Sequence, residues 1–193
     1  MVNCGSKKIK MKKIWLLIFS LLILLASFNI SFAGSHSEPG FAKDPAEKVN
    51  YELPYPGLLP DSPLYFLRII RDKTVGFLIA DPKKKAEFDL LQADKRLNAG
   101  IYLFKKNKIA QSLSTVSKAE NYFQEAIQKI KEARRQGTET TGIINKLIDS
   151  SKKHQEVLRS LMEKTPQNFK VSFNRELQRI NDFEKEVISL TLK

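Results

Sequence analysis

The chain has 193 residues, a formal net charge of +12 and one cysteine, Cys4. Cys4 precedes the segment that has the pattern of an export signal, so the exported protein is free of cysteine. That excludes disulfides, thiol catalysis and cysteine-based zinc or iron–sulfur sites within it.

The N-terminal segment predicts export. Five lysines precede the apolar run IWLLIFSLLILLA, and the sequence SFA at 31–33 offers the small residues that a signal peptidase recognises. We therefore predict a signal peptide over residues 1–33, cleaved after Ala33, and a periplasmic, extracellular or cell-surface location. Met11 is an alternative start. An uncleaved membrane anchor is the competing hypothesis, because residues 14–33 are long enough to span a bilayer.

Cleavage removes 33 of the 193 residues, among them five lysines and no acid, and lowers the net charge from +12 to +7. In an exported chain this excess of cations favours anionic lipid, cell-wall polymer or an acidic protein as the partner, and argues against nucleic acid. A solvated, lysine-rich surface is the plainer explanation of the same excess.

Residues 34–60 are rich in Pro and Gly and show neither a helical nor an alternating period, so we predict an extended linker there. Recognition of its prolines by a binding partner is an alternative. Four apolar side chains are expected to dock on the domain that follows: Tyr51, Tyr55, Leu58 and Leu59.

The stretch PDSP at 60–63 is interpreted as a helix start. Asp61 or Ser62 can accept hydrogen bonds from free backbone N–H groups, and Pro63 suits the first helical position because its missing N–H costs nothing there. We expect a helix over residues 63–80.

This first helix is amphipathic. We expect its apolar face to pack against the domain, and contact with a membrane surface is the alternative. The apolar line carries Phe66, Ile70 and Phe77, and the opposite side carries Arg68, Arg71 and Asp72.

Four further helices follow from apolar residues at three- and four-residue spacing. Asp81 and Pro82 can start the first of them, as a cap and a first helical residue. The first three of these helices are expected to end at KKNK (105–108), at Gly137 as a left-handed C-cap, and before Pro166. The last helix runs to the C-terminus, and the helix before Pro166 is expected to start at Thr140 or Thr141.

No window alternates as a β-strand does. The sequence therefore predicts an all-α fold, an elongated antiparallel bundle of about five helices over residues 61–193.

Three segments carry a resemblance: LLPDSPLYFLRIIRDK, DPKKKAEFDLLQADKRL and KHQEVLRSLMEKTP. Together they resemble an uncharacterised family of all-helical domains found in exported proteins of bacteria and archaea, with segments near LPDSPLYFLK, DPEKKAEL and HQEVL. Arg68 stands where the family pattern has lysine, and Phe88 where it has leucine. The resemblance spans residues 57–166 and implies fold and export. It brings no catalytic residues.

His154 is the weak candidate for a metal ligand or a catalytic base. Its neighbours Asp149, Ser150 and Glu156 complete no paired-histidine or His-Glu-x-x-His spacing. We expect a histidine at the edge of the apolar stripe whose ring packs and whose nitrogen meets a helix-end carbonyl or a carboxylate.

Other catalytic signals are missing from the sequence. Asp89 and Asp94 are expected on solvated helix surface near Lys95, and neither a glycine-rich phosphate loop nor a serine nucleophile elbow occurs. We predict no enzyme activity and no cofactor.

Lys83, Lys84 and Lys85 are the candidate anion contact, because positive charge at a helix N-terminus is unfavourable for the helix itself. The cluster at 105–108 lies at a helix C-terminus, where lysines complement the dipole.

These features predict a binding function. The first hypothesis is an exported scaffold, adaptor or chaperone-like module that contacts an unknown protein or other envelope component. The alternative is a membrane-surface or cell-wall polyanion binder that uses the first helix and Lys83–Lys85, and a metal binder or enzyme centred on His154 is the third. The oligomeric state is open, because Phe173, Phe183 and Leu190 can close the bundle or pair with a second copy.

Overall fold

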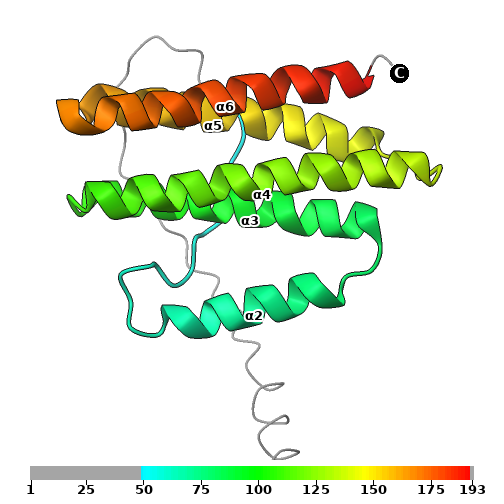
Figure 1. Ribbon diagram of the computed structural model, residues 1–193, viewed down its shortest axis with the longest axis horizontal. Helices are drawn as coiled ribbons and strands as arrows, with labels where there is room; N and C mark the ends of the chain where they lie inside the picture. Colours follow the sequence, from blue (N-terminus) through cyan, green and yellow to red (C-terminus); the bar gives the residue numbers. More distant parts are fainter. Residues whose placement is uncertain (1–48, 192–193) are drawn as a thin grey trace, which may run out of the picture. The chain divides into compact units, whose positions relative to one another are not determined.

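Helices make up most of the chain that the structure describes. The computed structural model describes residues 49–191; the predicted signal peptide, its cleavage at Ala33 and the first part of the linker lie outside this range. The helices are α2 (Tyr65–Leu78), α3 (Pro82–Lys105), α4 (Ile109–Arg135), α5 (Thr141–Lys164) and α6 (Gln167–Thr191), as Figure 1 shows. The predicted all-α bundle is confirmed, and no strand occurs within residues 49–191.

Two helical hairpins build the core. α3 packs along α4, and α5 along α6; α3 also contacts α5, and α4 contacts α6 (Figure 1). The largest apolar side chains that are completely buried between them include Phe123, Phe173, Leu97, Ile127 and Ile180. Every fully buried core residue comes from these four helices and none from α2, which lies along α3.

Most predicted helix boundaries are confirmed. Asp81 caps α3 by accepting from the backbone N–H groups of Lys83 (2.8 Å) and Lys84 (3.1 Å), and Pro82 occupies the first turn. Gly137 follows α4 with a φ of +75°, a left-handed conformation that glycine adopts without strain.

The start of α2 differs from the prediction. The helix begins at Tyr65 rather than at Pro63, after a turn over 60–64, and no side chain caps it. Ser62 Oγ accepts only from the N–H of Leu64, at 3.4 Å. The sequence PDSP therefore makes a turn ahead of the helix.

Asp61 has a different partner from the one predicted. Its carboxylate accepts from Nζ of Lys108 (2.8 Å) and of Lys106 (3.0 Å), in the turn between α3 and α4. These two hydrogen bonds lower the pKa of Asp61 to about 2. Asp61 thus fastens the approach to α2 onto the end of α3.

The linker is bound to the bundle over residues 49–60. The N–H of Val49 donates to Glu156 Oε2 over 3.0 Å, and the amide of Asn98 donates to the carbonyl of Pro54 over 3.0 Å. Tyr51 docks as expected, but Tyr55 is 72% exposed, and Leu58 is exposed as well, contrary to expectation. This part of the linker belongs to the domain.

α3 and α4 meet closely at Gly100. A Cβ atom at this position would lie 2.6 Å from Cγ2 of Val116, and the carbonyl of Gly100 accepts from Ser112 Oγ over 2.8 Å. Only glycine leaves room for this contact.

Candidate functional site

The apolar face of α2 points away from the bundle. Phe77 is 88% exposed, and the residues of α2 that are buried are Arg68 and Asp72. The expectation that this face packs against the domain is therefore wrong. The exposed apolar side chains of α2 are Phe66, Leu67, Ile70, Val75, Phe77 and Leu78.

Arg68 holds α2 to the linker. Its Nη1 donates to the carbonyl of Leu58 over 2.7 Å and also to the carbonyl of Pro56, and its Nε lies 3.4 Å from Asp72 Oδ2. A buried guanidinium needs such acceptors because burying a charge without partners is costly. The inner face of α2 is consequently fixed by hydrogen bonds and charge.

Arg96 of α3 completes this polar contact. Its Nη2 lies 3.7 Å from Asp72 Oδ2, its Nη1 donates to Gln92 Oε1 over 2.6 Å, and its guanidinium lies 4.0 Å from the ring centre of Tyr122. The contact between α2 and the bundle thus has charged and polar side chains at its centre, where helix contacts usually have apolar ones.

Cations flank the outward face of α2. At about 100° per residue, Phe66, Ile70 and Phe77 fall within an arc of roughly 40°, while Lys73 lies on one side of the apolar surface and Arg71 on the other. Lys73 and Arg71 are both exposed. An apolar strip bordered by long basic side chains is the pattern of helices that lie in a membrane interface.

The lysines predicted as an anion contact are mostly engaged in ion pairs. Lys83 lies 3.5 Å from Glu139, and Lys85 lies 2.5 Å from Asp89. Lys84 is exposed and has no ion pair within the described part of the chain. The structure thus brings Lys83 and Lys85 to carboxylates of the protein itself.

A second cluster of polar groups lies inside the bundle and centres on His154. The imidazole is completely buried, with Nδ1 2.8 Å from Glu120 Oε1 and Nε2 3.2 Å from Asp94 Oδ1. Burial lowers the pKa of His154, but the attraction of Glu120 and hydrogen bonds to Asp94 and Glu120 outweigh this effect and raise it to about 9. His154 is therefore an imidazolium at neutral pH, between two carboxylates.

Asp94 also receives two hydroxyl groups. Ser150 Oγ donates to Oδ1 over 2.6 Å, and the hydroxyl of Tyr51 in the linker donates to Oδ2 over 2.6 Å. Burial, and next the charge of Asp94, raise the pKa of Tyr51, so its hydroxyl stays protonated and donates. The cluster thus joins the linker, α3, α4 and α5.

The sequence indicated one member of this cluster and missed the others. His154 was expected at the edge of its stripe, yet it lies in the centre, seven residues after Leu147 and four before Leu158. Asp94 is buried rather than solvated, and so is Asp89, whose burial raises its pKa despite Lys85. The missed signal is Glu120, which falls in register with the apolar stripe of α4.

The geometry of this cluster suits structure better than chemistry. Both ring nitrogens of His154 already face carboxylates, and residues 49–191 contain no group of three His, Asp, Glu or Cys side chains arranged to hold a metal ion. His154, Glu120 and Ser150 are completely buried and Asp94 almost so, while Tyr51 is half-buried.

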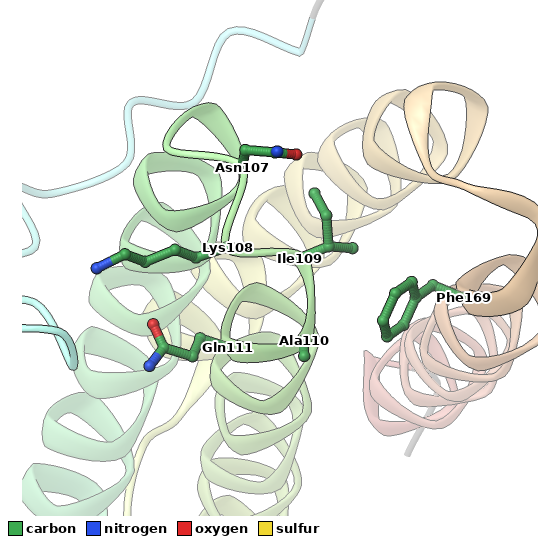
Figure 2. Close-up of a pocket in the computed structure, with 6 residues that line it drawn as sticks. All are labelled: Asn107, Lys108, Ile109, Ala110, Gln111 and Phe169. Atoms are coloured by element: carbon green, nitrogen blue, oxygen red, sulfur yellow. The ribbon is translucent and has the colours of Figure 1, made fainter.

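A hollow of about 410 Å³ lies where α3 turns into α4, beside the start of α6. Figure 2 shows Phe169 facing Ile109 across it. The charged residue in its lining is Lys108, whose amine lies 2.8 Å from Asp61, so the hollow offers little polar chemistry. The other lining residues are Asn107, Ala110 and Gln111.

None of the helices within residues 49–191 combines the length and the apolar character needed to cross a bilayer.

Comparison with known proteins gives a family and no activity. The pattern of a family described as "Domain of unknown function (DUF5667)" matches residues 57–168, more than half of the chain and close to the range of the resemblance. Neither the curated proteins nor the solved structures gave a match.

Proposed function

We propose that this chain, which belongs to the family of uncharacterised domains, is an exported binding module. It docks on a membrane surface through the outward face of α2. The observation that carries the proposal is the orientation of α2, with Arg68 and Asp72 buried and Phe66, Ile70 and Phe77 in solvent. A contiguous exposed apolar surface of this kind is typical of an interaction site.

A lipid surface fits this face better than a protein groove does. The apolar strip belongs to a single helix whose two borders carry Lys73 and Arg71, and basic borders match anionic head groups while the strip enters the acyl region. Lys83–Lys85, the basic cluster of the original alternative, is less suited, because Lys83 and Lys85 pair with Glu139 and Asp89. The lipid-binding role is therefore assigned to α2, the other element of that alternative, without Lys83–Lys85.

The test uses residues 34–193, which contain the whole compact unit found for residues 45–193. Phe66, Ile70 and Phe77 are changed together to Ser, and binding to vesicles that contain phosphatidylglycerol is measured by co-flotation. We expect the apparent affinity to fall at least about tenfold, because the variant loses three exposed apolar side chains that would enter the bilayer.

A matched control is offered by α6, where Val171 and Ile188 are exposed apolar residues outside α2. Changing both to Ser should leave vesicle binding unaltered. An equal loss of vesicle affinity in both variants would mean that exposed apolar side chains contribute to binding wherever they lie, and would contradict the proposal.

A fluorescent reporter gives an independent measurement. Trp15, the single tryptophan of the chain, is absent from residues 34–193, so Phe77→Trp introduces a unique probe at a site that is 88% exposed. Its emission should shift to shorter wavelength on vesicles and be quenched by brominated acyl chains. An unshifted emission on vesicles, together with recovery from native envelope of a protein that requires Phe66, Ile70 and Phe77, would favour the scaffold hypothesis instead.

A further inference from the structure

Beside α2 a group of cations surrounds the carboxylate of Asp72. Arg71 Nη2 lies 2.8 Å, Arg68 Nε 3.4 Å and Arg96 Nη2 3.7 Å from the single carboxylate of Asp72. Three guanidinium groups thus lie within 4 Å of the carboxylate of Asp72, and a fourth cation, Lys95, directly precedes Arg96 on α3.

Lys95 lies outside ion-pair distance of every carboxylate among the described residues. It is half-buried and makes no ion pair or side-chain hydrogen bond with residues 49–191. Burial, and next repulsion from Arg68 and Arg71, lower the pKa of Lys95 against the attraction of Asp72. A partly desolvated amine in a positive field is stabilised by an external anion.

Arg71 and Lys95 are the members of this group that a ligand can reach. Arg68 and Arg96 are buried, and their guanidinium groups are occupied by the linker carbonyls, Gln92 and Tyr122. The side chain of Arg71 is 65% exposed. It also borders the apolar face of α2.

We propose that Arg71 and Lys95 bind a phosphate oxyanion, and that this phosphate belongs to the head group of an anionic lipid. The inference rests on the proposed function: a lipid whose acyl chains contact the outward face of α2 presents its phosphate at the border where Arg71 lies. Guanidinium and ammonium groups are the usual protein partners of phosphate.

Lys95→Gln is the variant that tests the site, because Lys95 makes no bond to a described residue that the substitution would break. Binding of residues 34–193 is compared on vesicles of phosphatidylcholine alone and of phosphatidylcholine mixed with phosphatidylglycerol. We expect Lys95→Gln to lower affinity for the mixed vesicles about fivefold, the weight of one basic residue near an anionic surface. Affinity for phosphatidylcholine alone should not change.

Lys170→Gln is the matched control, since Lys170 is a half-buried lysine of α6 that makes no ion pair within the described residues. Equal loss of affinity in both variants would mean that net charge alone acts, and would overturn the proposed site. Unchanged affinity in Lys95→Gln would overturn it too.

Free phosphate is distinguished from lipid by thermal unfolding in phosphate and in chloride at equal ionic strength. A stabilisation by phosphate that depends on Lys95, combined with vesicle binding that does not, would assign the site to a free anion and overturn the lipid assignment. Unaltered vesicle binding after substitution of Phe66, Ile70 and Phe77 would refute the docking function alone. A loss of affinity for the mixed vesicles that is specific to Lys95→Gln would still identify the phosphate site.

Discussion

Nδ1 of His154 lies 2.8 Å from Oε1 of Glu120, and both side chains are completely buried. With Asp94 on the other ring nitrogen, the imidazolium is held between two carboxylates in the middle of the bundle. Such a group is expensive to bury and stable only when its partners are in place, so it makes the fold sensitive to the protonation of one ring.

The first prediction is a loss of stability at alkaline pH. The pKa of His154 is about 9 in the folded protein against 6.5 for a free histidine, so the folded state binds the proton more tightly. This contribution is complete below pH 6.5 and disappears as the pH rises through 9. The free energy of unfolding should fall by about 2–3 kcal/mol between pH 7 and pH 10, measured by urea unfolding.

An NMR titration separates His154 from other groups in this range. In a His36→Gln variant of residues 34–193, the remaining imidazole signals belong to His154 and should titrate near pH 9. A midpoint near 6.5 would show that the buried carboxylates do not hold the proton.

The second prediction concerns the linker. Tyr51→Phe removes the hydroxyl that donates to Asp94 and should lower the free energy of unfolding by about 1.5–3 kcal/mol, as is usual for a hydrogen bond to a charged group. Residues 49–60 should also be cleaved faster by protease in the variant. Tyr55→Phe is the control, because Tyr55 is exposed and should tolerate the change. Equal effects in both variants would contradict the role given to Tyr51.

The third prediction tests the contact between α3 and α4. Gly100→Ala forces a Cβ atom to 2.6 Å from Val116 Cγ2 and should destabilise the protein by about 1–3 kcal/mol. Gly142→Ala, in the first turn of α5, meets no atom within 4 Å and should be neutral or stabilising by up to about 1 kcal/mol. Thermal unfolding of the two variants gives the comparison, and a stable Gly100→Ala would show that the helices can separate locally.

The fourth prediction distinguishes the two supposed caps. Asp81→Ala removes an oxygen that accepts from two backbone N–H groups and should cost about 1 kcal/mol. Ser62→Ala should change stability little, since the 3.4 Å contact of Ser62 lies in an exposed turn ahead of α2. A larger loss for Ser62→Ala would restore the helix-start role that the sequence assigned to it.

The bundle could be predicted from the sequence because its helices follow simple rules. The three- and four-residue spacing of apolar side chains in α3 to α6 matches the buried residues, and Asp81, Gly137 and Pro166 mark boundaries through backbone chemistry that depends only on neighbouring residues. Patterns of this kind depend only on neighbouring residues, so they can be recognised without knowing the tertiary structure.

The candidate site could not be predicted in the same way. Amphipathic spacing in α2 shows which side is apolar, but which side faces the bundle depends on partners outside α2. These are the carbonyls of Pro56 and Leu58, which accept from Arg68, and the guanidinium of Arg96 on α3, which pairs with Asp72. The burial of Asp94 could not be predicted for the same reason, because its partners are Tyr51 in the linker and Ser150 on α5. Spacing within one helix carries no information on such partners.

The polar underside of α2 has a consequence for how the domain opens. Water can replace the hydrogen bonds and ion pairs of Arg68 and Asp72 when α2 lifts away, and α2 itself contributes no residue to the core. Amide hydrogens of α2 should therefore exchange with solvent through a local opening, while those at the centre of α4 should exchange only through global unfolding. The domain thus combines a four-helix core with one helix that lies outside it.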